Sequence, residues 1–306
     1  MLTLALDIGG TTIAAGLVDP AGTLVYSATV PTPNSVRAED IWAVVAKLIT
    51  EAIAVAGGAV RAVGIASAGP IDVPSGTVSP INITCWRGFP LRTRVAAVVP
   101  DVPVRLAGDG LCMVLAEHGY GAGRDARFLL GIVVSTGVGG GLVLDGSGYS
   151  GRTGNAGHVG HVVVDPDGQP CSCGGRGCVE TLAAGPALVR WARANGWRGS
   201  PGAGAEHLAN DASAGDPIAV RAFGRGAKAL AAMIASVAAV CDLDRVVIGG
   251  GVANAGPLLF DPLRAALAEH AGLDFLTGLR VLPAELGAEA GLIGAAMLAG
   301  SEYRFG

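Results

Sequence analysis

The sequence repeats one pattern at two distant places. LTLALDIGGTTIAAGLVD (residues 2–19) runs from an apolar stretch through a polar residue and a glycine cluster to a second apolar stretch, and FLLGIVVSTGVGGGLVLD (128–145) has the same order. Each segment predicts two strands joined by a tight glycine turn, which is a β-hairpin. We therefore expect two duplicated domains, each opening with such a hairpin. The alternative is a chance similarity between valine- and glycine-rich segments.

Helical patterns lie between and after the hairpins. Apolar residues recur at helical spacing over residues 40–56, 217–239 and 258–269, and small residues predict a short helix over 291–299. A further strand, RVVIGGGVAN (245–254), ends in three glycines. Because strands alternate with helices, the predicted fold class is α/β.

Composition limits the classes of function. The chain has 306 residues, 51% of them hydrophobic, which is enough for two domains with buried cores. Its net charge of −4 lacks the basic excess of a nucleic-acid-binding protein. The start, MLTLALDIGG, has no charged region typical of a signal peptide, and no apolar run approaches transmembrane length. We expect a cytoplasmic protein that binds neither nucleic acid nor membrane, with reduced thiols.

The glycine turns are candidate phosphate sites, because such turns expose backbone N–H groups and let a phosphate approach closely. Neither turn is a Walker A loop or a G-x-G-x-x-G turn between strand and helix. Asp7, before the first turn, could hold Mg²⁺. Two turns in register and a third glycine cluster suggest a nucleotide held between two domains. The candidate nucleotide-binding residues are Asp7, Gly9, Gly10, Thr11, Thr12, Thr136, Gly137, Gly250 and Gly251.

A cysteine-rich stretch, GHVGHVVVDPDGQPCSCGGRGCVE (157–180), predicts a metal site. His161, Cys171, Cys173 and Cys178 supply one imidazole and three thiols, a set that suits a closed tetrahedral structural zinc site. The glycines between the last two cysteines would let the backbone wrap a small ion. The alternative is three buried free cysteines.

These motifs resemble the ROK family (repressors, open reading frames and sugar kinases) over essentially the whole chain. DIGGTT resembles the family's first phosphate loop, STGVGGG the second, and GGGV the adenosine loop. SAGPID and SPINIT resemble its sugar-binding segments, and residues 157–180 resemble its zinc signature. The resemblance implies a two-domain actin/hexokinase-like ATPase fold (ribonuclease H-like), with a nucleotide and sugar cleft between the domains. It also implies ATP, Mg²⁺ and structural Zn²⁺, with His161, Cys171, Cys173 and Cys178 as the zinc ligands.

The family's architecture implies the domain limits. We expect an N-terminal domain over residues 1–120 that regains a C-terminal helix over 291–306. The C-terminal domain would then span 121–290 and contain the zinc loop at 157–180. Sugar would close the cleft between them, and a homodimer or homotetramer is expected by resemblance.

The resemblance also assigns roles to single residues. Locally Asp109 is an ordinary turn or N-cap residue between a strand and a helix, but it stands where the family has its catalytic aspartate. That role is to accept a proton from the sugar's 6-hydroxyl. The expected substrate-binding residues are Gly69, Asn82, Asp109, His158, His161 and Glu180.

Four positions depart from the family's usual pattern. Gly108 and Leu111 stand where the family usually has Asn and then Asn or Gln, so one sugar contact is missing. His158 replaces the Glu of many glucokinases and resembles N-acetylmannosamine kinases, and Thr12 stands where a lysine is frequent. These departures leave the identity of the sugar open.

The expected function is therefore an ATP-dependent hexose kinase acting on glucose, with N-acetylmannosamine or N-acetylglucosamine as the alternative substrate. A catalytically weak sugar-sensing regulator is the alternative from another class. A DNA-binding repressor is disfavoured, because only six residues precede Asp7. The phosphoryl donor stays open between ATP and polyphosphate.

Overall fold

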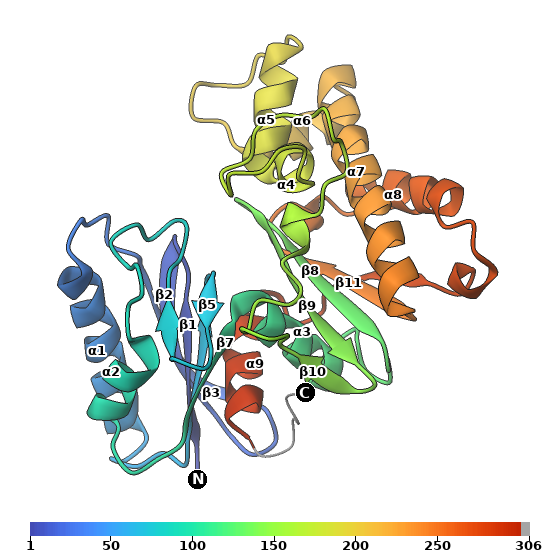
Figure 1. Cartoon of the computed structure of the whole chain (residues 1–306). Helices are drawn as coiled ribbons and strands as arrows, with labels where there is room; N and C mark the ends of the chain where they lie inside the picture. Colours follow the sequence, from blue (N-terminus) through green and yellow to red (C-terminus); the bar gives the residue numbers. More distant parts are fainter. Residues whose placement is uncertain (301–306) are drawn as a thin grey trace. The chain divides into compact units, whose positions relative to one another are not determined.

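The computed structural model describes residues 1–300, which form two compact units (Figure 1). The first unit contains Met1–Asp125, Gly141–Gly157 and the described residues from Ala288 onward, and the second contains Ala126–Gly140 and His158–Gly287. The expected domains, 1–120 with 291–306 and 121–290, stay a prediction. The compact units differ from them chiefly in placing 141–157 with the first unit. Residues 301–306 of the expected closing helix lie outside the described chain.

The first sheet has five strands in the order β3-β2-β1-β4-β7. Strands β1 and β2 form the first predicted hairpin, pairing antiparallel from Thr3↔Val18 to Ile8↔Ile13, and β3 continues it. Strands β1, β4 and β7 run parallel. The strands are β1 (Thr3–Ile8), β2 (Thr12–Val18), β3 (Leu24–Pro31), β4 (Val63–Ser67) and β7 (Val104–Gly108).

The second sheet has the same arrangement, in the order β10-β9-β8-β11-β12. Strands β9 and β10 pair antiparallel, whereas β8, β11 and β12 run parallel. The strands are β8 (Leu129–Val134), β9 (Val138–Leu144), β10 (Ser147–Tyr149), β11 (Arg245–Gly249) and β12 (Arg280–Pro283). Two sheets with one strand order and one pattern of directions are what the sequence repeat predicts, and the α/β class is confirmed. A small third sheet pairs β5 (Ile71–Asp72) with β6 (Thr77–Val78).

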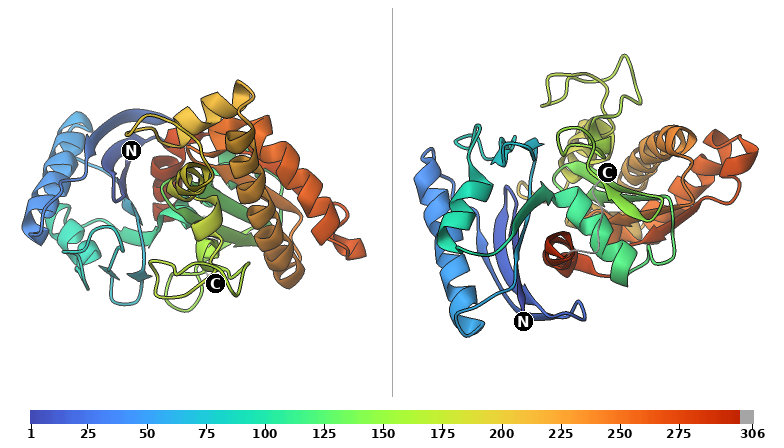
Figure 2. Two further views of the ribbon diagram at one scale, coloured as in Figure 1. Left: turned by 90° about the horizontal axis from the view of Figure 1, so that it is seen from above. Right: turned by 60° about the horizontal axis from the view of Figure 1, so that its bottom comes forward.

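Helices cover both faces of the first sheet (Figures 1 and 2). On one face, α1 (Ala38–Val55) and α2 (Leu91–Val98) enclose the main hydrophobic core, in which Trp86 is fully buried. The apolar stripe of α1 explains its position, because its buried residues recur at spacings of three and four. On the other face lie α3 (Asp109–Tyr120) and α9 (Ala290–Ala299).

The second unit is mainly helical outside its sheet. Its helices are α4 (Glu180–Ala183), α5 (Gly185–Ala194), α6 (Ala205–Ser213), α7 (Pro217–Cys241) and α8 (Pro257–His270). Short 3₁₀ turns span Val159–His161, Ala253–Ala255 and Asp274–Leu276, and another, Gly287–Glu289, stands where the chain passes into the first unit. Helix α7 begins at Asp216, whose Oδ1 accepts the N–H groups of Ile218 and Ala219 at 2.8 Å each. The expected start of that helix is confirmed.

Helix α7 also bears on the expected absence of a long apolar stretch. By length and composition alone it is the one helix within residues 1–300 that could cross a membrane. Half of its most apolar 18-residue window is buried inside the structure. A buried core helix has the same composition, because it must bury most of its circumference.

Two glycines allow α9 to pack closely. A Cβ added to Gly64 in β4 would overlap the carbonyl oxygen of Ala295, and one added to Gly294 would overlap the carbonyl oxygen of Cys112 in α3. Each glycine thus brings α9 into backbone contact with a neighbouring element. Helix α9 is held at a fixed depth against the sheet.

We expect Gly294→Ala to destabilise the protein by about 1–3 kcal/mol, the usual cost of forcing extra atoms into a packed core. Gly224→Ala is the matched control, because Gly224 lies within α7 and a Cβ there meets nothing within 4 Å. That control should be neutral or slightly stabilising. Thermal denaturation of both variants checks this, and an unchanged midpoint for Gly294→Ala would contradict the packing argument.

Candidate active site and metal centre

The first glycine turn is fixed by hydrogen bonds to its neighbours. The N–H of Gly9 donates to the carbonyl of Thr12 at 2.9 Å, which closes the turn between β1 and β2. Thr32, directly after β3, makes two further hydrogen bonds to the turn. Its hydroxyl donates to the carbonyl of Gly9 at 2.7 Å, and its N–H donates to the carbonyl of Thr11 at 2.9 Å. Thr11 and Thr12 are exposed. The turn is therefore rigid and open to a ligand.

Asp7 lies at the end of β1, beside the first turn of α9. A Cβ on Gly291 would overlap its Oδ2, so only glycine lets the carboxyl group approach the helix there. Burial, and then the nearby Asp109 carboxylate, raise the pKa of Asp7 to about 7. Two neighbouring carboxylates are oxygen ligands of the kind Mg²⁺ prefers, and a cation would relieve their repulsion.

Asp109 is the first residue of α3 and directly follows β7. Its side chain is exposed, and its Oδ1 accepts the N–H of Gly110 at 2.7 Å. One turn further along, burial raises the pKa of the Cys112 thiol, and the charges of Asp7 and Asp109 raise it further. The structure thus brings Asp7 and Asp109 together at one edge of the first sheet.

The two predicted sugar segments of the first unit lie side by side. The N–H of Ile81 donates to the carbonyl of Gly69 at 3.2 Å, and the N–H of Ser79 donates to the carbonyl of Pro70 at 2.8 Å. Arg87 stabilises the second segment, because its Nη1 donates hydrogen bonds to the carbonyls of Ser79 and Pro80. Gly69 and the exposed Asn82 therefore come from one local structure.

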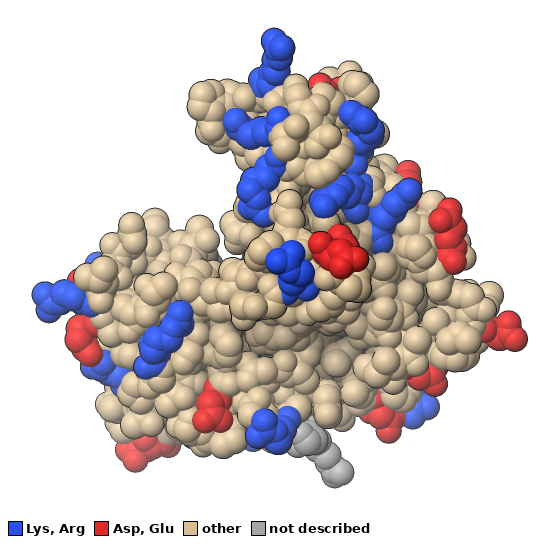
Figure 3. Space-filling model, turned by 45° about the horizontal axis from the view of Figure 1, so that its top comes forward, with Lys and Arg blue, Asp and Glu red and all other residues tan. Residues whose placement is uncertain are grey.

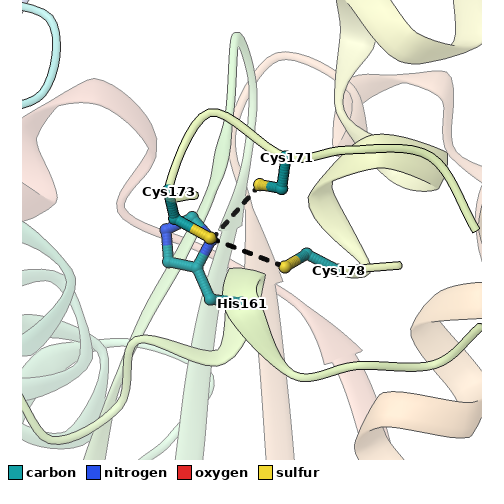
Figure 4. A group of neighbouring side chains, drawn as sticks. All are labelled: His161, Cys171, Cys173 and Cys178. Atoms are coloured by element: carbon teal, nitrogen blue, oxygen red, sulfur yellow. Dashed lines mark hydrogen bonds between the residues drawn. The ribbon is translucent and has the colours of Figure 1, made fainter. Parts of the chain in front are cut away.

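The four predicted metal ligands meet in the second unit (Figure 4). Their ligand atoms all lie within 4.8 Å of one another. The Sγ atoms of Cys173 and Cys178 are 3.8 Å apart, and Cys171 Sγ is 3.7 Å from His161 Nδ1. A tetrahedron with Zn–S distances of about 2.3 Å has edges of about 3.8 Å, so the cluster already has the dimensions of a zinc site.

The chain around the cluster is shaped to wrap a small ion. Gly177 has a φ of +71°, and a Cβ there would overlap the carbonyl oxygen of Asp165. The N–H of Gly175 lowers the pKa of Cys173, whereas burial raises the pKa of Cys178 to about 12. A bound cation would stabilise three thiolates this close together, and the Cys₃His donor set is the one that structural zinc uses.

Glu180 joins the metal cluster to the second glycine turn. It is the first residue of α4, and its Oε2 accepts the N–H of Val138 at 2.9 Å. Its Oε1 lies 4.0 Å from Cys171 Sγ. His158 is exposed at the start of the 3₁₀ turn, with its ring 6.4 Å from that of His161. The 3₁₀ turn itself spans Val159–His161, and so places His158 and His161 at its two ends.

The second unit also contains a cavity of about 840 Å³ next to its glycine turn. Two of the predicted nucleotide residues, Thr136 and Gly251, line it. Gly250 shapes the approach, because its φ is +92° and a Cβ would overlap the carbonyl oxygen of Val134. Most of the other walls come from α5, α6 and the loop between them, and Phe223 of α7 with Val252, Asn254 and Ala255 completes the lining.

Arg193 is a site residue that the sequence analysis missed. Its Nη2 donates to the carbonyls of Ser200, Pro201 and Ala203 at 2.7, 3.3 and 3.5 Å, and so fixes the loop that forms one wall of the cavity. Lys and Arg side chains gather over this helical part of the second unit (Figure 3). A run of small residues with an arginine before it carries no signal of such a wall, so only the structure could find it.

Two sheets of one strand order, each opening with a glycine-turn hairpin, together with paired carboxylates, define a protein of the actin-like ATPase fold. The sequence model of the ROK family matches residues 3–302. The chain belongs to the ROK family.

Its relatives include two kinds of sugar kinase. A glucokinase of Streptomyces coelicolor is 35% identical over 97% of this chain and 97% of its own. An N-acetylmannosamine kinase of Escherichia fergusonii is also 35% identical, over 99% of both chains. A ROK family glucokinase from Streptomyces griseus, solved in complex with glucose and AMPPNP, superposes with a TM-score of 0.85 at 37% identity, covering 98% of this chain and 99% of that one.

We expect the purified protein to contain about one zinc ion per chain, bound by three sulfurs and one nitrogen. Cys173→Ser should abolish zinc binding, because it removes one of the ligands. Cys85→Ser is the control, since Cys85 lies outside the cluster. Elemental analysis and X-ray absorption check both, and active protein that holds no zinc would refute the assignment.

Proposed function

We propose that this chain is an ATP-dependent sugar kinase that phosphorylates the 6-hydroxyl of a hexose, with glucose as the first candidate. The observation that carries the proposal is the exposed Asp109 carboxylate beside Asp7, at the edge of a sheet that opens with a glycine turn. Relatives named glucokinase support this assignment. Polyphosphate as the donor stays an alternative to ATP.

In the proposed mechanism Asp109 accepts the proton of the sugar's 6-hydroxyl as that oxygen attacks the γ-phosphorus, while the bond from this phosphorus to the bridging oxygen of ATP breaks and ADP leaves. The exposure of its carboxylate lets a substrate hydroxyl reach it. Asp7 is the proposed protein ligand of Mg²⁺, which when bound neutralises charge on the transferring phosphoryl group. The backbone N–H groups of the two glycine turns are proposed to hold the phosphates.

The nucleoside is assigned to the cavity in the second unit. Its volume of about 840 Å³ is within the range of ligand sites, and its apolar walls suit a base. Arg190 and Arg193 supply positive charge at this cavity, which favours a phosphorylated ligand.

The sugar contacts are proposed unit by unit. Gly69 and Asn82 would bind hydroxyls in the first unit, and His158, His161 and Glu180 in the second. Because His161 Nδ1 faces the cysteines, its Nε2 is left for a substrate. Zinc is proposed to be structural here, fixing His161 and, through Cys178, Glu180.

A coupled ADP-release assay with glucose, mannose, N-acetylglucosamine and N-acetylmannosamine tests the function. We expect turnover with glucose, and we expect Asp109→Asn to lower kcat by at least ~10²-fold while sugar binding weakens less. Wild-type turnover in Asp109→Asn would remove Asp109 from the role of base. Sugar binding without turnover on any of the four would favour a sugar-sensing regulator instead.

His158 provides a separate prediction about the sugar. A glutamate accepts two hydroxyl hydrogen bonds, whereas a neutral histidine accepts one and donates one. A 2-acetamido group offers a carbonyl acceptor, which suits the histidine donor and favours N-acetylmannosamine as the second substrate. His158→Glu should therefore shift preference toward glucose by about 1–3 kcal/mol, the scale of one mispaired polar group that a bound sugar covers.

The ratio of kcat/KM for glucose and N-acetylmannosamine measures this shift. Zinc content serves as the control, because His158 lies near the metal cluster. If His158 only packs against the zinc loop, stability or zinc occupancy falls and the ratio stays unchanged. An unchanged ratio in protein that keeps its zinc would rule out the specificity role.

A further inference from the structure

We infer that one glycine in each turn leaves room for a side chain that positions the sugar. Gly10 accommodates Asn82, and Gly137 accommodates Glu180. We call each of these contacts the seating of the side chain on its glycine. The inference rests on the proposed function and deepens it, because it links the two substrates through contacts inside each unit. It gives these glycines a task that a phosphate cradle alone does not require.

In the first unit the contact is between Gly10 and Asn82. A Cβ added to Gly10 would overlap Asn82 Nδ2 and would lie 2.5 Å from its Cγ and 2.9 Å from its Cβ. These three atoms extend from the base of the side chain to its tip, so rotating only the terminal amide cannot remove the overlap. The adjacent Gly9 differs, because a Cβ there meets only the carbonyl oxygen of Thr12, at 3.2 Å.

In the second unit the corresponding contact is between Gly137 and Glu180. A Cβ added to Gly137 would lie 2.7 Å from Glu180 Oε2, the atom that accepts the N–H of Val138 at 2.9 Å. The carboxylate is thus held by the turn's own backbone, and a side chain at 137 would displace it from this position. Gly139 is again different, because a Cβ there meets nothing within 4 Å.

The two contacts have one physical consequence. A phosphate that orders either turn also orders the side chain seated on it, and a bound sugar that orders the side chain stabilises the turn. Such linkage is reciprocal, so each substrate should tighten the binding of the other. Asn82 and Glu180 come from different parts of the sequence, so the two contacts are independent observations.

The first test compares Gly10→Ala with Gly9→Ala by steady-state kinetics with glucose and ATP. If Gly10 seats Asn82, Gly10→Ala raises KM for glucose about tenfold or more, as expected for a displaced substrate ligand, and changes KM for ATP much less. Gly9→Ala should act mainly on KM for ATP. A Gly10→Ala variant that raises only KM for ATP overturns the inference for the first unit.

A double-mutant cycle separates seating from misfolding. Asn82→Ala should reproduce the glucose effect without altering the turn, and Gly10→Ala should add little in the Asn82→Ala background, because both act through one contact. Effects that multiply fully in the double variant overturn the inference. The cycle can also be measured as glucose affinity by calorimetry, which needs no turnover.

The second test compares Gly137→Ala with Gly139→Ala. The first should raise KM for glucose about tenfold or more, by displacing the Glu180 carboxylate, and the second should leave it within about threefold. Equal effects of the two substitutions overturn the inference for the second unit. If the wild-type protein binds glucose but transfers no phosphoryl group, the proposed function is wrong. The effect of each glycine substitution on glucose affinity can still be measured in that case. Absence of sugar binding in the wild type overturns both.

Discussion

The close approach of α9 to the first sheet is the constraint on which the first unit depends. Backbone meets backbone at Gly64 and at Gly294, where any side chain would overlap a carbonyl oxygen. The same helix meets Asp7 through Gly291. Glycine at these three positions therefore sets how closely α9 packs against the sheet. The same packing creates the buried environment that raises the pKa of Asp7 to about 7. A change in helix depth would alter the chemistry of the site as well as the stability of the core.

In the second unit the corresponding organiser is the metal cluster. Its four ligands converge at distances that match a tetrahedral ion, and Glu180 follows two residues after the last ligand. One oxygen of Glu180 is on the backbone of the second glycine turn and the other is near Cys171. The metal cluster and the second glycine turn are therefore adjacent parts of one small structure, although Val138 and Glu180 are 42 positions apart in sequence.

The sequence predicted those features whose physics is local. The two hairpins, the helix that begins at Asp216 and the Cys₃His cluster each follow from neighbouring residues, and each is present in the structure. Contacts across the chain could not be predicted this way. The contact of Asn82 with Gly10 and the hydrogen bonds of Arg193 to residues 200–203 depend on where separate segments of the chain meet. No periodicity or spacing in the sequence encodes such contacts. Roles such as that of Asp109 came from resemblance, because a turn aspartate is not distinctive by itself.

The division of the chain into units has a consequence for how the protein is made. The first unit needs the segment from Ala288 onward, yet the whole of the second unit's long segment, His158–Gly287, is synthesised before it. The first unit is therefore the first to begin synthesis and the last to have all of its segments made. Until α9 is synthesised, β1 and β4 lack the helix that packs against them in the folded protein. The first unit can therefore reach its complete fold only after the long segment of the second unit has been made.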